Sequence, residues 1–441
     1  MCLRIGQVPT VVVSSPEYAK EVMRTHDVVF AFRPRVLYLQ IMFYNSTSMG
    51  SAPYGEYWRR LRKIYREEVL STKRVQSFRP IREKEMLNLV EWIALNVGSA
   101  INLTEKVQTL MYGIIYWAAF GKRSRDHEEF ISIVEEAIKI SVGFELADLF
   151  PSFSFLAHLI SRSRPKYERL KRRAARIIEN IVKEHKENMS EGKSGESGTE
   201  EDLVDVLLKF HNNGELGCSL TSDNLKAIIF EIFAAGGETA ATTIDWAMVE
   251  MIRNPRVMKK AQDEIRKVFS RKEIVDETGI SEMKYLKSVV KETLRLHTPA
   301  PLSPRESREN CEINGYEIPA KTMIVTNTWA IGRDPKYWTE PESFIPERFL
   351  DSSIEFSGNH FEYIPFGAGR RICPGMSFGL INVQLLLAML LYHFDWKLPN
   401  AMKHEDLDMT ELCGVTLKRK DALHLIPTAY DMSPIEKSHG R

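Results

Sequence analysis

The chain has 441 residues, of which 44% are hydrophobic and 27% charged, with a formal net charge of +1. This composition is typical of a globular protein with a sizeable core, and the absence of a basic excess argues against a general nucleic-acid-binding protein. The five cysteines are scattered and never form a C-x-x-C pair, which argues against a disulfide framework or a zinc or iron–sulfur site and indicates a reducing compartment.

The N-terminal segment, residues 1–13, alternates apolar residues around a short valine run and predicts a small β-hairpin. A helix follows, introduced by the stretch "SSPEYAKEV". Arg4, Gly6 and Pro9 interrupt the apolar run, which is too short for a signal peptide or a membrane span. We therefore expect no membrane anchor in the chain as written.

Apolar residues at helical spacing run through most of the remaining chain. They predict helices over residues 56–72, 79–97, 104–121, 127–143, 165–189, 202–211, 222–253, 255–268 and 281–296. The apolar stretch 380–394 is shorter than a membrane span and contains polar residues, so it predicts a buried core helix. Short strands are predicted at 311–326, with a hairpin turn at Asn314 and Gly315, and at 413–427. The pattern is mainly α with a small β-rich lobe, and we expect residues 1–441 to form a single domain.

The loop "PFGAGRRICPG" places Cys373 among glycines and arginines, whereas a cysteine that only fills core space normally lies among aliphatic residues. The helix predicted after it directs free N–H groups and the positive end of its dipole at the sulfur, which favours a thiolate. Gly367, Gly369 and Gly375 let a flat, bulky group approach the backbone, and Arg371 offers that group a cation. A single thiolate without other ligands fits haem iron. The alternatives are a disulfide partner and an inert cysteine in a tight turn.

This loop resembles the signature F-x-x-G-x-R-x-C-x-G of the cytochrome P-450 monooxygenases, matched by Phe366, Gly369, Arg371, Cys373 and Gly375. The resemblance implies the cytochrome P-450 fold, in which haem b lies between a long central helix and the helix after the cysteine loop. It makes Cys373 the metal ligand. It also implies cofactor contacts from this loop at Phe366, Gly367, Arg371 and Gly375.

The stretch "IIFEIFAAGGETAATTIDWAMVEM" sets two glycines, an acid and an alcohol inside an apolar helix, against helix propensity. Such a conflict often marks a functional distortion; the alternative is a buried threonine beside a capped glutamate. The stretch resembles the family's A-G-x-[DE]-T, matched by Ala235, Gly236, Glu238 and Thr239. The resemblance implies a kink over the haem, with Thr239 positioning protons at bound oxygen and Glu238 relaying them from solvent. Ala240 stands where the family often has a second hydroxyl.

Glu292 and Arg295 stand three residues apart on a predicted helix and share one face. Taken alone, such a pair is usually solvated. It resembles the family's E-x-x-R, and Arg348 in "FIPERF" would complete a buried ion triad that supports the cysteine loop. Arg305 matches the family's second cation for a haem propionate.

In "YGEYWRRLRKIYREEVL", Trp58 and Arg62 share one helical face, while Arg59, Lys63 and Arg66 share another. The alternative is a solvated basic helix with one aromatic anchor. The stretch resembles the family's W-x-x-x-R helix, which implies that Trp58 and Arg62 reach the haem propionates. The outer basic face would attract the flavin domain of a reductase.

The resemblance covers essentially the whole chain and is closest to the plant microsomal clade of specialised metabolism, including terpenoid oxidases. It implies a single catalytic domain over residues 1–441, O₂ as co-substrate, and electrons from NADPH through NADPH-cytochrome P-450 reductase. Members usually begin with a membrane helix and a Pro-rich hinge, so the chain is expected to be N-terminally truncated. The full-length form would lie on the cytosolic face of the endoplasmic reticulum membrane.

By resemblance, the substrate pocket should draw on residues 36–52, 141–157, 228–239, 299–303 and 412–416. The apolar candidates there are Leu37, Leu39, Ile41, Phe43, Phe144, Leu146, Phe233, Ala234, Ala235, Ala300, Leu302, Leu412 and Val415. An apolar pocket suits a hydrocarbon skeleton, and we expect a terpenoid, a sesquiterpene or macrocyclic diterpene first. The alternatives are fatty-acid, phenolic or alkaloid substrates, a non-oxygenating haem-thiolate enzyme that rearranges hydroperoxides, and a haem-binding sensor or carrier.

Overall fold

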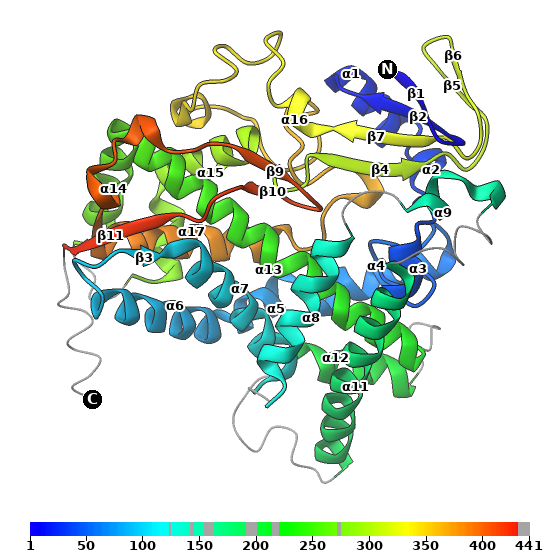
Figure 1. The fold of residues 1–441 in the computed structure, drawn as a ribbon, viewed down its shortest axis with the longest axis horizontal. Coiled ribbons are helices and arrows are strands. Elements are labelled where there is room, and N and C mark those ends of the chain that lie inside the picture. The colour runs from blue at the N-terminus through cyan, green and yellow to red at the C-terminus, as the bar shows by residue number, and fades with distance from the viewer. Residues whose placement is uncertain are drawn as a thin grey trace.

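The computed structural model describes residues 1–122, 125–141, 145–153, 163–190, 201–213, 220–270 and 275–430. Helices fill most of the view in Figure 1, and a small sheet region lies at the upper right, as the mainly α prediction requires. The α-helices are α1 (Pro16–Lys20), α2 (Asp27–Phe30), α3 (Leu37–Met42), α4 (Glu56–Ile64), α5 (Thr72–Ser77), α6 (Arg79–Ala94), α7 (Leu103–Phe120), α8 (His127–Ile140), α9 (Leu146–Leu149), α11 (Ser163–Ser190), α12 (Leu203–Asn213), α13 (Ser222–Arg253), α14 (Pro255–Phe269), α15 (Lys284–Leu296), α16 (Thr328–Ile331) and α17 (Met376–His393).

The predicted helices agree with these bounds to within a few residues at most ends. The predicted helix 56–72 divides into α4 and a π-helical turn, η2 (Tyr65–Val69). The start of the predicted helix 281–296 belongs instead to a 3₁₀ segment, η5 (Glu277–Glu282), that precedes α15. Helix boundaries depend on capping and local packing, which apolar periodicity does not report.

The strands are β1 (Cys2–Ile5), β2 (Val8–Val13), β3 (Ile101–Asn102), β4 (Leu302–Glu306), β5 (Cys311–Ile313), β6 (Tyr316–Ile318), β7 (Met323–Asn327), β8 (Phe394–Lys397), β9 (Glu411–Cys413), β10 (Leu417–Arg419) and β11 (His424–Ala429). The largest sheet has the order β1-β2-β7-β4, with β2 and β7 parallel and the other pairs antiparallel. The β5–β6 hairpin turns at Asn314 and Gly315, whose φ angles are 49° and 82°. Both predicted hairpins, at the N-terminus and at Asn314–Gly315, are thus confirmed.

Helix α13 runs through the middle of the molecule and packs against α7, α17 and α15. It is buried on nearly all sides because it separates two hydrophobic clusters, one shared with α6, α14, α15 and α17, the other with α3, α8, α11 and α12. Both α13 and α17 are long and apolar enough to cross a membrane, yet 67% and 61% of their apolar windows are buried inside the protein. A helix that is apolar all round belongs in a core, as predicted for residues 380–394.

Candidate active site

The cysteine loop leads directly into α17, and its backbone is tightly turned. The Cys373 N–H donates to the Phe366 carbonyl at 2.9 Å. Gly367 has a φ of 70°, and a Cβ there would meet no atom within 4 Å because the residue borders a cavity. Gly369 has a φ of 67°, but a Cβ there would collide with the Met23 carbonyl oxygen. Packing against neighbouring backbone therefore requires Gly369, which corrects the expectation that it makes room for a cofactor.

The sulfur of Cys373 is enclosed by protein and exposed toward the cavity. Burial raises the pKa of the Cys373 thiol, because a thiolate is poorly solvated in a protein interior. The N–H groups of Gly375 and Met376 and the Arg62 guanidinium act in the opposite direction. The helix start thus favours a thiolate as predicted, but it does not outweigh burial. A bound metal ion would supply the missing positive charge, since a coordinating thiol is deprotonated outright.

A cavity of about 440 Å³ lies between α13 and the cysteine loop. One wall is formed by Ala235, Gly236 and Thr239 of α13, and its remaining walls are largely apolar. The opposite wall contains the loop residues Phe366, Gly367, Arg371, Cys373 and Gly375. The structure therefore brings the predicted oxygen-side and cysteine-side residues to one space, although more than a hundred residues separate them in the sequence.

Three arginines gather at one side of this cavity; Arg305 and Arg371 are buried, and Arg33 is half-buried. Arg33 and Arg305 both line it, as does Arg371. Burial and the charge of Arg305 lower the pKa of Arg33 to about 10. Arg305 donates to Asp27 Oδ1 at 3.1 Å and to the Ala368 carbonyl at 2.8 Å, and its Nε has no hydrogen-bond partner among the described residues. Asp27 and Glu231 offset part of the repulsion among these cations, and a further anionic partner would offset more of it. Sequence reasoning missed Arg33.

Arg371 is held only by uncharged groups. Its guanidinium donates to the carbonyl oxygens of Ala31, Met49 and Ala52 at 2.8, 3.0 and 2.5 Å. Burial, followed by the charges of the neighbouring arginines, lowers its pKa to about 8. A ligand with carboxylates at this side of the cavity would remove that cost.

The two residues expected to reach such carboxylates from α4 contact Arg371 and Met49. Trp58 is 3% exposed, and its indole N–H donates to the Met49 carbonyl at 2.9 Å. The Arg371 guanidinium carbon lies over the Trp58 ring, 4.7 Å from the ring centroid. Arg62 contacts the Met49 sulfur at 3.8 Å. In this arrangement, Trp58 orients Arg371, and direct contact of Trp58 or Arg62 with a cofactor stays a prediction.

The two glycines of α13 serve helix packing. A Cβ on Gly237 would lie 2.5 Å from the Tyr112 ring, and one on Gly236 would lie 2.8 Å from Ile115. Both neighbours belong to α7, so the glycines allow α7 to approach closely. The helix continues as α-helix through these residues. The close approach of the Tyr112 ring to the α13 backbone, and not added flexibility, therefore explains Gly237.

Thr239 lies on the cavity wall, where its hydroxyl donates to the Ala235 carbonyl at 2.8 Å. One turn later, Thr243 also lines the cavity and donates its hydroxyl to the Thr239 carbonyl at 2.9 Å. Thr243 was missed by sequence reasoning, which noted only the hydroxyl absent at Ala240. The sequence did contain a signal for Thr243, because residues four apart on a helix share one face and Thr243 follows Thr239 at that spacing.

Glu238 is buried but does not line the cavity. Its carboxylate accepts from the Thr416 hydroxyl at 2.8 Å and from Lys418 Nζ at 3.2 Å. The carboxylate is therefore held at the β10 side of α13. Its part in proton transfer stays a prediction.

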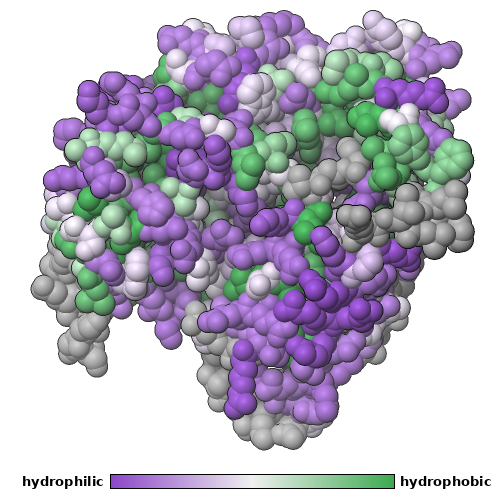
Figure 2. Space-filling model, in the orientation of Figure 1, coloured by the Kyte–Doolittle hydropathy of each residue, from purple (hydrophilic) through white to green (hydrophobic). Residues whose placement is uncertain are grey.

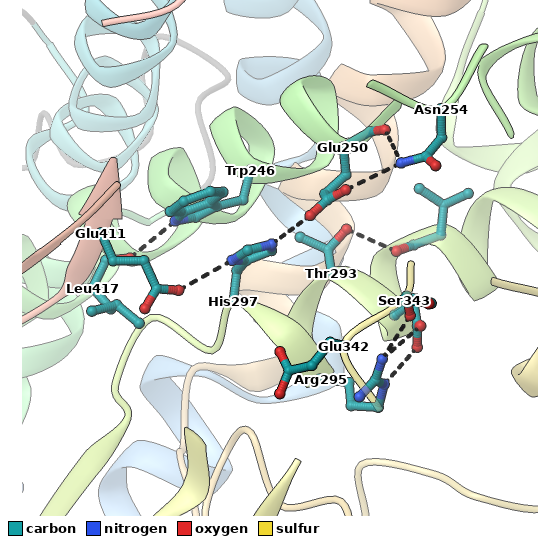
Figure 3. A network of polar contacts seen from close by, with 12 residues as sticks. Trp246, Glu250, Asn254, Thr293, Arg295, His297, Glu342, Ser343, Glu411 and Leu417 are labelled. Carbon is teal, nitrogen blue, oxygen red and sulfur yellow. Dashed lines mark hydrogen bonds and ion pairs between the residues drawn. The ribbon is translucent and has the colours of Figure 1, made fainter. Parts of the chain in front are cut away.

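The predicted ion triad is confirmed. Glu292 is fully buried and accepts from Arg295 Nε at 2.8 Å and from Arg348 Nε at 3.0 Å. Arg295 also donates to the carbonyls of Gly332, Pro341 and Ser343, the last of which is drawn in Figure 3. Every charge is partnered, as a buried ionic group requires, so this site is scaffold.

Most of the apolar pocket candidates do not line the cavity. Ala235 and Ala300 do. Phe233 is fully buried against Tyr116 and Phe120 in the core. The other candidates are packed in the core or exposed at the surface, and Phe144 lies outside the described residues: Leu37, Ile41 and Phe43 are buried, Leu39 and Ala234 partly buried, and Leu146, Leu302, Leu412 and Val415 exposed.

Comparison with known proteins agrees with this geometry. A model of the cytochrome P450 family matches residues 1–426. Cytochrome P450 71D11 of Lotus japonicus is 55% identical over 429 residues, which cover 97% of this chain and 87% of the relative. Premnaspirodiene oxygenase of Hyoscyamus muticus is 50% identical, covering 98% and 86%. Tabersonine 16-hydroxylase 1 of Catharanthus roseus is 51% identical, covering 98% and 85%.

The chain belongs to the cytochrome P450 family. A zebra fish cytochrome P450 solved with abiraterone has the same fold, with a TM-score of 0.81 at 23% identity, covering 98% of this chain and 95% of that one. The P450 family comprises haem b monooxygenases, so this chain is a haem-containing oxidoreductase.

The residues of this P450 fit haem b. Cys373 offers one sulfur donor, Gly367 leaves open space beside it, and the orphaned Nε of Arg305 together with Arg33 and Arg371 suits two propionates. When bound, the haem supplies oxygen activation at an iron held by thiolate. The arginines would neutralise its acidic groups by charge-assisted hydrogen bonds.

The role assigned to Arg33 can be tested. Arg33→Gln is expected to weaken haem retention by about 10- to 100-fold, because a charged hydrogen bond to a buried carboxylate is lost. The haem-to-protein ratio after repeated gel filtration measures this loss. Arg35→Gln removes a nearby exposed arginine and should retain haem normally; equal retention in both variants would contradict the assignment.

Proposed function

We propose that this P450 inserts one oxygen atom from O₂ into a neutral, apolar plant metabolite, a terpenoid first, with electrons from NADPH through NADPH-cytochrome P450 reductase. The observation that carries the proposal is the cavity wall. Among the described residues, Glu231 supplies its only carboxylate. That carboxylate already accepts from the N–H groups of Met49 and Gly50, at 3.0 and 2.7 Å, and from the Tyr65 hydroxyl at 3.1 Å.

A carboxylate with three donors has little capacity left for a substrate ammonium group. The charge of the wall therefore favours a neutral hydrocarbon skeleton over a protonated alkaloid. The relatives include both premnaspirodiene oxygenase and tabersonine hydroxylases, so similarity alone does not choose. Fatty-acid and phenolic substrates remain outcomes of the substrate screen.

In the proposed reaction, Cys373 would hold the iron, and Arg33, Arg305 and Arg371 would orient the haem. The apolar wall excludes water from the substrate, which strengthens the polar interactions that remain. Thr239 holds a proton at its hydroxyl, which rotates from the Ala235 carbonyl toward the cavity. Glu238 supplies that proton from the solvent side of α13. A non-oxygenating rearrangement would leave this acid–alcohol pair without a role.

We place the partners on two surfaces. The exposed basic side chains Arg59, Lys63 and Arg66 of α4 and η2 form a face for the acidic flavin domain of the reductase. Figure 2 shows apolar residues gathered at the upper right, over the sheet region. Leu3 of β1 and Tyr316 of β6, two strands of the sheet region, are 39% and 65% exposed and suit contact with the endoplasmic reticulum membrane at its cytosolic face. Residues 1–441 would act as one catalytic domain.

Thr239→Ala tests the oxygen chemistry. The variant should still bind haem and substrate. The product formed per NADPH should fall by about 10²-fold, which is the lower end of the range for losing a group that transfers protons, and the peroxide released should rise. Thr239→Ser should restore product. The assay reconstitutes the protein with a plant reductase and screens a terpene panel by Soret shift and mass spectrometry.

Thr242→Ala is the matched control, since Thr242 is buried on α13 away from the cavity wall. Unchanged product per NADPH in Thr239→Ala would show that the hydroxyl is not needed. A thiolate-type spectrum of the reduced, CO-treated protein without substrate-dependent NADPH use would contradict the monooxygenase proposal. A panel without any Soret shift would contradict the terpenoid assignment.

A further inference from the structure

The β9–β10 hairpin brings two polar side chains to the buried carboxylate of Glu238. Thr416, 4% exposed, donates its hydroxyl at 2.8 Å, and Lys418 lies 3.2 Å away. The Lys418 side chain is 48% exposed, so it joins Glu238 to solvent. These contacts do not form the cavity wall, and the role proposed for Glu238 does not by itself require them.

The hairpin is fixed on α13 by a second set of contacts away from Glu238. Trp246 donates its Nε1 to the Leu417 carbonyl at 3.1 Å. The His297 ring stacks on Trp246 at 3.9 Å and contacts Glu411 of β9 at 3.4 Å and Glu250 of α13 at 2.8 Å. Figure 3 shows this chain of contacts from α13 through His297 to the hairpin. It holds the hairpin in register with α13, which places Thr416 and Lys418 beside Glu238.

The charges around Glu238 depend on Lys418. Burial raises the pKa of Glu135 of α8, and the nearby charge of Glu238 raises it further. The charge of Lys418 lowers the pKa of Glu135 and so acts against this rise. Tyr112 of α7 faces the same carboxylates, which raise its pKa further above the value that burial sets. Lys418 is thus the cation facing two acids and a phenol, and Thr416 is the neutral donor.

We propose that Thr416 and Lys418 are positioning residues that hold the Glu238 carboxylate in one orientation for taking up protons from solvent. The proposal rests on the proposed function of Glu238 as a proton relay. In each transfer, Glu238 accepts one proton on the solvent side and passes one on toward Thr239, so that its charge is restored. Without the two donors the carboxylate is free to turn away, and proton delivery slows.

The experiment measures peroxide released per O₂ consumed, with NADPH and a plant reductase, in Lys418→Met and Thr416→Val. Both should raise the peroxide fraction by about 5-fold, the effect of losing one hydrogen bond of ordinary net strength, and enlarge the solvent isotope effect. Lys418→Arg and Thr416→Ser should restore wild-type values. Lys420→Met, an exposed lysine beside the hairpin, is the matched control and should change neither quantity.

Hydrogen exchange of the amides of residues 411–419 separates positioning from folding. It should stay at the wild-type rate in Lys418→Met, because Trp246 and His297 still hold the hairpin. Faster exchange throughout the hairpin, or a peroxide fraction that stays at the wild-type value, would overturn the proposal.

Glu238→Gln separates the two hypotheses. If it leaves the peroxide fraction unchanged, the relay itself is wrong. If Glu238→Gln raises peroxide while Lys418→Met and Thr416→Val do not, only the positioning role is wrong. Because the residues act in one path, Glu238→Gln combined with Lys418→Met should release no more peroxide than Glu238→Gln alone.

Discussion

Glu292→Ala is expected to destabilise the protein by about 3–5 kcal/mol, the cost of removing one partner from a buried ionic group. The change leaves Arg295, which is 1% exposed, without the carboxylate that binds its Nε and Nη2. It also removes the acceptor of the Ile345 N–H at 2.8 Å and of Arg348. The loss therefore reaches the segment that leads toward the cysteine loop.

The yield of haem-loaded protein and the midpoint of thermal unfolding measure this effect. Asp263→Ala is the control, because it breaks an ion pair with Lys259 in which both side chains are well exposed, where about 0–1 kcal/mol is expected. Arg295→Ala should destabilise the protein to a similar extent, since it leaves the buried Glu292 carboxylate without one of its cationic partners. A normal yield and midpoint in Glu292→Ala would contradict the structural role of the triad.

Cys373→Ser is expected to abolish monooxygenation, even in protein that retains haem. The thiolate pushes electron density onto the iron, and an alcohol or imidazole ligand does so far less. Cys373→His should fail in the same way. Both variants should also lose the thiolate-type spectrum of the reduced, CO-treated protein.

Cys311→Ser provides the control for loss of a cysteine. Cys311 lies in β5, partly exposed, with its sulfur 3.5 Å from His26 Nδ1, and its substitution should leave spectrum and turnover unchanged. Wild-type turnover in Cys373→Ser would rule out haem-thiolate chemistry in this protein.

The elements of the site differ in how far the sequence predicts them. Helix α13 was predicted with its bounds, 222–253, because apolar residues recur at helical spacing over a long run. The ion triad was predicted from the resemblance of Glu292, Arg295 and the stretch "FIPERF" to the family's motifs, because the spacing of Glu292 and Arg295 alone is more typical of a solvated pair. The packing role of the α13 glycines was not predicted, because the space occupied by Tyr112 and Ile115 of α7 decides it.

The sequence by itself determined the mainly α fold, the family and the cysteine, because these depend on short-range periodicity and on residues closely spaced in one motif. Only the tertiary structure decided the surroundings of the site. Arg33, which no sequence pattern indicated, joins Arg305 and Arg371, which the sequence predicted, at one side of the cavity. Glu238 meets Thr416 and Lys418 across 178 and 180 residues. Such contacts follow from how helices and strands pack, and the spacing of residues along a chain does not encode them locally.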